Sequence, residues 1–87
     1  MNSKKKKEIR KLLGAHLQRH RLDILKIPSV RQLSFTSNLD QSKLSKIEKG
    51  RVDVRLDTLI EISLTYRLDL KDLFDFHISF WDKELEN

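Results

Sequence analysis

The sequence predicts an all-α domain built from five helices. Apolar residues recur at helical spacing along most of the chain, and only two glycines and one proline interrupt its 87 residues. The stop signals Pro28, Asn38 and Gly50 divide it into segments of helical length. A chain this short forms one domain with a modest core, so dimerisation would stabilise it.

The first two helices are expected over residues 4–25 and 30–37. Pro28 ends the first helix, and Ser29 is a good N-cap for the second. Asn38 is expected at the sharp turn that follows, in the left-handed conformation that asparagine tolerates. The first helix is amphipathic because its apolar residues share one face: Ile9, Leu12, Leu13, Leu17 and Ile24.

Three further helices are expected after that turn. Asp40 can cap a third helix that runs to about Lys49, and Gly50 supplies the residue that ends it. A fourth helix starts near Leu56, and a fifth begins at Asp69. Beyond them, apolar and polar residues alternate through residues 76–81, which suits a short strand, although a continued helix fits equally well.

Charge is distributed unevenly along the chain. Residues 1–51 contain 14 basic side chains (Lys and Arg) and 4 acidic ones (Asp and Glu), a net charge of +10. Residues 52–87 contain 4 basic and 9 acidic side chains, a net charge of −5. The basic half suggests a face that meets a polyanion. We therefore divide the chain into a basic segment (1–8), a helical domain (9–76) and a C-terminal tail (77–87).

Several classes of function are disfavoured by what the sequence lacks. Without cysteine it has neither a disulfide framework nor a thiolate metal site, and no apolar run approaches the ~18 residues of a membrane span. Lys4–Lys7 precedes no apolar stretch, so a secretory signal is not expected and a cytoplasmic location is the default. His16 and His20 lie one turn apart, but no third metal ligand follows, so we expect partly buried structural histidines. We expect no enzyme activity, metal or cofactor, since no nucleophile–base pair or phosphate-cradling glycine loop is present.

Residues 33–50 carry the most information about function. They predict a short helix, a tight turn and a second short helix, with Leu33, Leu39, Leu44 and Ile47 facing inward. Glu48 is unusual on a helix otherwise rich in donors, so we expect it to turn inward and hold a cation or a backbone N–H. Polar side chains occupy the outer faces of the second helix: Gln41, Ser42, Ser45, Lys46 and Lys49.

This segment resembles the helix-turn-helix of the lambda-repressor-like, Cro-type (XRE) family. The resemblance is carried by Leu33-Ser34, Asn38, Asp40-Gln41-Ser42 and Ile47-Glu48-Lys49-Gly50, and it covers about Ile9 to Phe76. The later segments Leu56-Asp-Thr-Leu59, Ile62 and Leu70-Lys-Asp-Leu-Phe74 follow the family's fourth and fifth helices. The resemblance implies an all-α, five-helix lambda-repressor-like domain with a short C-terminal extension. The third helix of such a domain enters the DNA major groove.

The resemblance also implies roles for individual residues. Gln41, Ser42 and Lys46 fall where the family contacts bases. Val30 stands where the family often has a phosphate-binding glutamine, so that contact is either lost or passes to Ser29 or Arg31. Other phosphate contacts are expected from Lys43, Lys49, Arg51 and Arg55. The implied function is transcriptional regulation, such as repression, by a homodimer that binds a palindromic operator in double-stranded DNA.

The tail supports a second hypothesis. Four large apolar side chains lie within residues 76–81, and apolar groups concentrated in this way seldom remain exposed. They could pair two copies of the chain, fold back onto their own core, or serve an antitoxin or adaptor that binds a toxin or another protein. We predict that they form the homodimer interface, together with the fifth helix: Leu73, Phe76, Ile78, Phe80 and Trp81.

Overall fold

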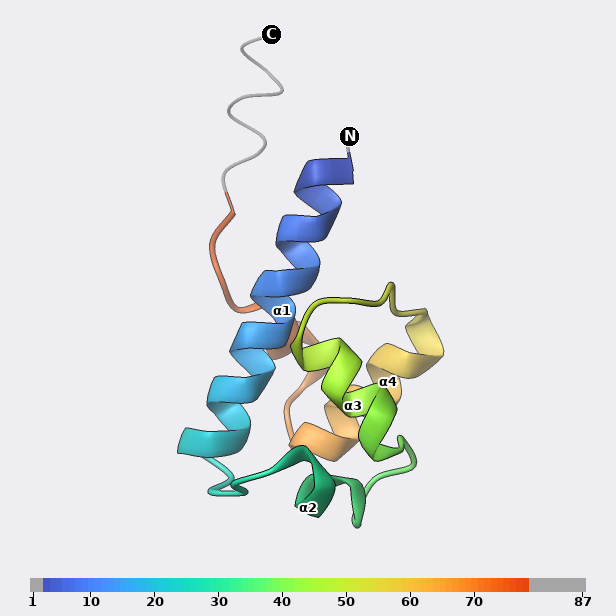
Figure 1. The fold of residues 1–87 in the computed structure, drawn as a ribbon. Helices are drawn as coiled ribbons and strands as arrows, with labels where there is room; N and C mark the ends of the chain where they lie inside the picture. The colour runs from blue at the N-terminus through green and yellow to red at the C-terminus, as the bar shows by residue number, and fades with distance from the viewer. Residues whose placement is uncertain (1–2, 79–87) are drawn as a thin grey trace, which may run out of the picture.

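A computed structural model describes residues 3–78 and confirms an all-α architecture (Figure 1). It contains four α-helices and one 3₁₀ turn, and no strand occurs within this described range. The elements are α1 (Ser3–Asp23), α2 (Val30–Ser34), α3 (Gln41–Glu48), α4 (Leu56–Tyr66) and the 3₁₀ helix η1 (Leu70–Phe74).

The prediction of five α-helices is therefore wrong at the fifth element. Asp69 occupies the N-cap position of η1 but makes no side-chain capping bond, so the expected capping box is absent. The backbone then closes by short-range bonds, from Asp75 N–H to the Asp72 carbonyl and from Phe76 N–H to the Phe74 carbonyl. These bonds limit η1 to one short segment. The strand or helix predicted over residues 76–81 is absent from residues 76–78, which are irregular, and its remaining residues lie outside the described range.

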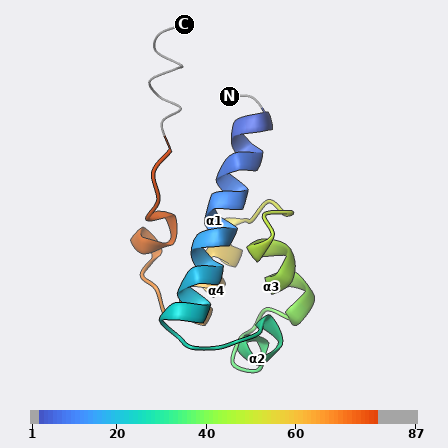
Figure 2. The same cartoon turned by 60° about the vertical axis from the view of Figure 1, so that its left-hand side comes forward.

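Helix α1 is the longest element, and its first turns include the lysine run of residues 4–7. It ends at Asp23, two residues before the predicted end. Lys26 has a φ of 59° and reverses the chain, and the N–H of Ile27 returns to the carbonyl of Arg21. α3 and α4 pack against α1, α2 packs against α3, and the N-terminal part of α1 extends beyond them (Figures 1 and 2).

One apolar core joins all five elements. Every element supplies buried side chains to it, and in Figure 2 α3 and η1 lie on opposite sides of α1, with α4 behind α1. Three of the four inward residues predicted in the helix-turn-helix are buried here, and the fourth, Leu39, packs against the core. The buried residues are Leu13, Leu17, Leu33, Leu44, Ile47, Ile62, Tyr66 and Leu73.

The turn between α2 and α3 differs from the prediction. α2 ends at Ser34, and Asn38 is not among the described residues with positive φ, which are Lys26, Gly50 and Arg67. The Ser37 hydroxyl instead accepts the N–H of Leu39 at 2.9 Å and pairs with the Thr65 hydroxyl at 2.7 Å. This side-chain turn reverses the chain without a left-handed residue at Asn38.

The predicted caps and the histidine assignment are confirmed. Ser29 accepts the N–H of Gln32 at 3.2 Å, and Asp40 accepts the N–H of Lys43 at 2.7 Å. The half-buried His16 and His20 each place Nε2 2.9 Å from a backbone carbonyl, of Asp72 and Tyr66 respectively. These histidines thus fasten α1 to η1 and to the end of α4. No helix among residues 3–78 is long and apolar enough to cross a membrane.

Candidate nucleic-acid interface

The position of α3 is fixed by a glycine contact with α1. A Cβ built on Gly14 would lie 2.2 Å from the carbonyl oxygen of Glu48, so only glycine permits this approach. Gly50 has a φ of 69°, which confirms its predicted role in ending α3. A Cβ on Gly50 would lie 2.7 Å from the Cα of Lys11. The C-terminal end of α3 is thus pressed against α1 at two glycines.

Glu48 points into the domain, as predicted from the sequence. Arg21 donates from Nε to Oε2 at 2.9 Å and from its terminal nitrogen NH2 to Oε1 at 3.0 Å. Tyr66 donates its hydroxyl proton to Oε2 at 2.6 Å. Arg21 also donates to the Ile27 carbonyl at 3.0 Å. This cluster of Arg21, Glu48 and Tyr66 joins α1, α3, α4 and the loop after α1.

The cluster keeps the carboxylate of Glu48 compensated inside the protein. The Arg21 and Glu48 side chains are each only 6% exposed. The hydrogen bond from Arg21 to Glu48 raises the pKa of Arg21 above its ordinary value. Burial, followed by the hydrogen bond to Glu48, raises the pKa of Tyr66 far above its usual range. The Glu48 charge therefore does not oppose an anion that approaches the outside of α3.

The three residues expected to contact bases lie together on the outer face of α3. Gln41, Ser42 and Lys46 are exposed and border one open hollow, with Asp40, Ser45 and Arg51 also on its rim. The opposite face of α3 carries the buried Leu44 and Ile47. Hydrogen-bonding side chains are thus presented outward from a helix whose inner side is held rigidly. We call the set Gln41, Ser42, Ser45 and Lys46 the outer face of α3.

The expected phosphate contacts are more dispersed. Lys49 and Arg51 are exposed beside α1, whereas Arg31 is exposed on α2 and Arg55 stands at the start of α4. Lys43 is half-buried on the first turn of α3. The Ser29 oxygen accepts an N–H as the cap of α2, which leaves its own proton available to another acceptor. The structure thus gathers Lys49 and Arg51 but leaves Arg31 and Arg55 at separate places.

A basic groove between α1 and the end of α3 was not predicted from the sequence. Lys7, Arg10 and Lys11 of α1 line it together with Lys49 and Arg51. The signal that could have revealed it is a spacing of three or four residues, since Lys7 and Lys11 share a helix face with Gly14 and Gln18. Knowing that this face meets α3 required the position of Gly14 in the fold. We call these five cations the basic groove.

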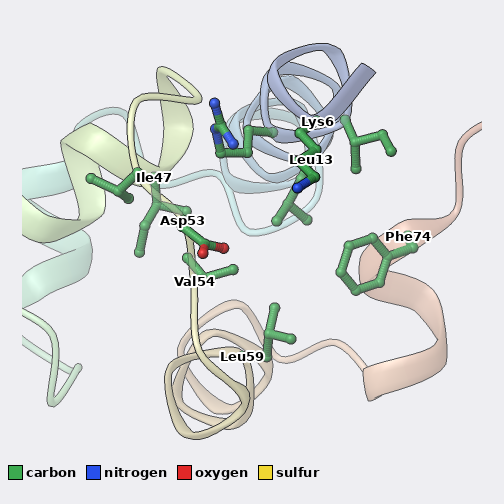
Figure 3. A pocket seen from close by; sticks show the side chains of 10 residues that line it. Lys6, Leu13, Ile47, Asp53, Val54, Leu59 and Phe74 are labelled. Atoms are coloured by element: carbon green, nitrogen blue, oxygen red, sulfur yellow. The ribbon is translucent and has the colours of Figure 1, made fainter. Parts of the chain in front are cut away.

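A separate hollow of about 360 Å³ opens between α1, the connector after α3, α4 and η1 (Figure 3). Leu13, Ile47, Val54, Leu59 and Phe74 give it a largely apolar lining, and Lys6, Asp53 and Arg10, which also borders the basic groove, contribute polar groups to it. The hollow offers hydrophobic contact rather than a set of converging donors. It therefore does not extend the polar surface of α3.

The structure divides the residues expected at a dimer interface. Leu73 is fully buried in the protomer's own core, which leaves it no surface for contact with a second copy. Phe76 is half-buried against the same core, with its ring centroid 6.2 Å from that of His16. Ile78 is half-buried, and Phe80 and Trp81 lie outside the described residues. A row of exposed apolar side chains occurs elsewhere, at successive turns of α4: Leu56, Ile60 and Leu64.

No protein-family model, no curated protein and no solved structure matches this chain.

Proposed function

We propose that this protein is a sequence-specific DNA-binding transcriptional regulator that binds a palindromic operator as a homodimer. The observation that carries the proposal is the outer face of α3. Gln41, Ser42 and Lys46 are presented together on it, while the Gly14 contact and the Glu48 cluster hold its inner side against α1. A short, rigidly supported helix with outward donors and acceptors suits the DNA major groove.

The side-chain chemistry of this face matches base edges. A glutamine amide pairs with the N6 and N7 of adenine, lysine favours the O6 and N7 of guanine, and serine can contact either kind of base. Helix α2 packs against α3 and supports it as the first helix of a helix-turn-helix. The flanking cations Arg31, Lys43, Lys49 and Arg51, with the hydroxyl of Ser29, would hold phosphates and set the orientation of α3.

Two-fold pairing would extend the recognition to a palindrome. In a homodimer the two α3 helices would read half-sites about one DNA turn, ~34 Å, apart. The number of protein–DNA interactions would double, which a domain with so few base-reading side chains needs for specificity. Pairing would also bury apolar surface that the small protomer cannot bury alone.

The experiment that tests this proposal begins with selection of a preferred duplex from a random pool. The affinity of the protein for this duplex and its single-base variants is then compared with that of Gln41→Ala and Lys46→Ala. Each substitution should relax discrimination at one base pair by about 1–3 kcal/mol. Lys71→Ala, an exposed lysine on η1, is the matched control and should leave discrimination unchanged. Equal losses on selected and random DNA would exclude base reading by that residue.

An adaptor or antitoxin that mainly binds another protein is the alternative. The exposed row Leu56, Ile60 and Leu64 on α4 favours it, because apolar groups at successive turns form a continuous strip. A heat-stable monomer whose affinity for DNA does not depend on salt would support this alternative. Selection of a defined duplex sequence would argue against it.

A further inference from the structure

We propose that the N-terminal half of α1 forms a second DNA-contacting surface, which holds the phosphate backbone beside the bases read by α3. The surface is the basic groove, and its α1 residues are Lys7, Arg10 and Lys11. This inference rests on the proposed function, since it extends the same protein–DNA interface to a flanking stretch of backbone.

The basic groove carries more positive than negative charge. Five cationic side chains line it, and within residues 3–78 none of them forms an ion pair. Its single acidic lining residue is Glu48, whose two oxygens are already bonded to Arg21 and Tyr66. The groove therefore holds an excess of uncompensated positive charge. Like charges gathered in this way repel one another unless an anion binds among them.

Close contacts between α1 and α3 hold the cations of the basic groove in place. Lys7 and Lys11 lie one helical turn apart on the α1 face that carries Gly14, and Gly14 touches α3. Gly50 presses the end of α3 against the backbone of Lys11. Lysines from α1 are thereby fixed next to Lys49 and Arg51, although about 40 residues separate them in the sequence.

The basic groove is continuous with the outer face of α3. Arg51 borders both the hollow that contains Gln41 and Lys46 and the groove that contains Lys7 and Lys11. α1 continues past the end of α3 toward its own N-terminus (Figure 1). A duplex seated on α3 would therefore meet the lysines of α1 at its flank. Consecutive turns of α1 are about 5.4 Å apart, so several phosphates can be engaged along the groove.

The test measures how DNA affinity depends on salt. The double variant Lys7→Gln/Lys11→Gln should weaken binding to selected and random duplexes by the same factor. The slope of log K against log salt should flatten by about 0.9 for each phosphate that the variant leaves unneutralised, or about 1.8 in all for each protomer. The matched control is Arg67→Gln/Lys71→Gln, which removes two exposed cations at the end of α4 and on η1. The control should keep the slope of the parent protein.

A second measurement locates the α1 surface along the DNA. The parent protein should lose affinity when about ten base pairs of flanking duplex, one helical turn, are removed from the selected sequence. The Lys7→Gln/Lys11→Gln variant should lose little on the same truncation, because it no longer holds the flanking backbone. Sequence discrimination should be unchanged in this variant.

Three results would overturn the inference. If the Lys7→Gln/Lys11→Gln slope equals that of the parent while Lys49→Gln flattens it, the α1 surface does not bind DNA, although the proposed function stands. If no variant and no salt concentration affects binding to any duplex, the proposed function fails together with the inference. If removal of the flanking duplex weakens the parent and the Lys7→Gln/Lys11→Gln variant equally, the α1 surface does not hold the flanking backbone.

Discussion

Gly14 faces the backbone of Glu48 so closely that a Cβ on Gly14 would lie 2.2 Å from the Glu48 carbonyl oxygen. The glycine stands in the middle of a 21-residue helix, where it lowers helix stability relative to alanine by about 1 kcal/mol. That local loss is offset by the close crossing it permits. The same stretch of α3 carries the Glu48 side chain that anchors it and the lysines that face outward, so this crossing fixes the orientation of the outer face.

Gly14→Ala should therefore destabilise the domain, although alanine is the better helix former. Because the obstructing atoms are backbone, they can move only if α3 shifts, and we expect a loss of about 1–3 kcal/mol. The free energy of unfolding by urea measures it. Ala15→Gly, at the exposed neighbouring position, is the control and should cost only about 1 kcal/mol through helix propensity. A Gly14→Ala protein more stable than the parent would contradict the close crossing.

The sequence predicted the elements whose signals are local. The caps Ser29 and Asp40 and the stop at Gly50 each act within a few residues, and each lies where it was expected. The inward direction of Glu48 was also predictable, because a carboxylate is out of place among outward-facing cations. The identity of the partner of Glu48 was not predictable, because Arg21 lies 27 residues away on a different helix.

The features that the sequence did not predict depend on interactions between distant segments. Asn38 was expected to be left-handed because asparagine tolerates that conformation, but the turn is held by Ser37 and by Thr65 of α4, 28 residues further on. The basic groove needs Gly14 and Gly50 to bring α1 and α3 together.

Removal of Arg21 should have a large effect on stability. Arg21→Met leaves the Glu48 carboxylate buried without its cation, which typically costs about 3–5 kcal/mol. The double variant Arg21→Met/Glu48→Gln removes the uncompensated charge as well, so it should be more stable than Arg21→Met alone. Urea denaturation of the parent, Arg21→Met, Glu48→Gln and the double variant checks this order and completes the double-mutant cycle. Additive losses from the two substitutions would mean that the two side chains do not act as a pair.

Tyr66 should make the domain sensitive to alkali. Its pKa in the folded protein is raised above the ordinary 10.0, first by burial and then by its hydrogen bond to Glu48. Between these two values the unfolded chain loses the phenolic proton while the folded chain keeps it. This contribution to stability is thus complete below about pH 10 and is lost as the pH rises toward the folded pKa.

Tyr66→Phe removes this titration and provides the comparison. At neutral pH it should be less stable than the parent by about 1.5–3 kcal/mol, the usual value of a hydrogen bond to a charged group. Above about pH 10 its free energy of unfolding should fall less steeply than that of the parent. Contributions from the lysines are common to both proteins and cancel. Because Tyr66 is the single tyrosine, its ionisation can be followed directly by absorbance. Parallel pH profiles would contradict the assignment.

The α2–α3 turn should depend on Ser37 more than on Asn38. Ser37→Ala removes the bond to the Thr65 hydroxyl and the acceptor for the Leu39 N–H, for a combined loss of about 1–2 kcal/mol. Asn38→Ala, at an exposed residue without positive φ, should change stability by less than about 0.5 kcal/mol. Thermal denaturation of the two variants distinguishes them. The reverse order would restore Asn38 as the residue that makes the turn.

Dimerisation should depend on the tail beyond the described residues. A chain that ends after Ile78 keeps the Phe76 packing against His16 and removes Phe80 and Trp81. Because large aromatic groups contribute most to small interfaces, this truncation and Trp81→Ala should both shift the protein toward monomer in sedimentation equilibrium. Leu64→Glu, which places a charge on the exposed row of α4, is the comparison and should leave association unchanged. If Leu64→Glu dissociates the protein while the truncated chain associates like the parent, the two copies meet at α4 and the tail has another use.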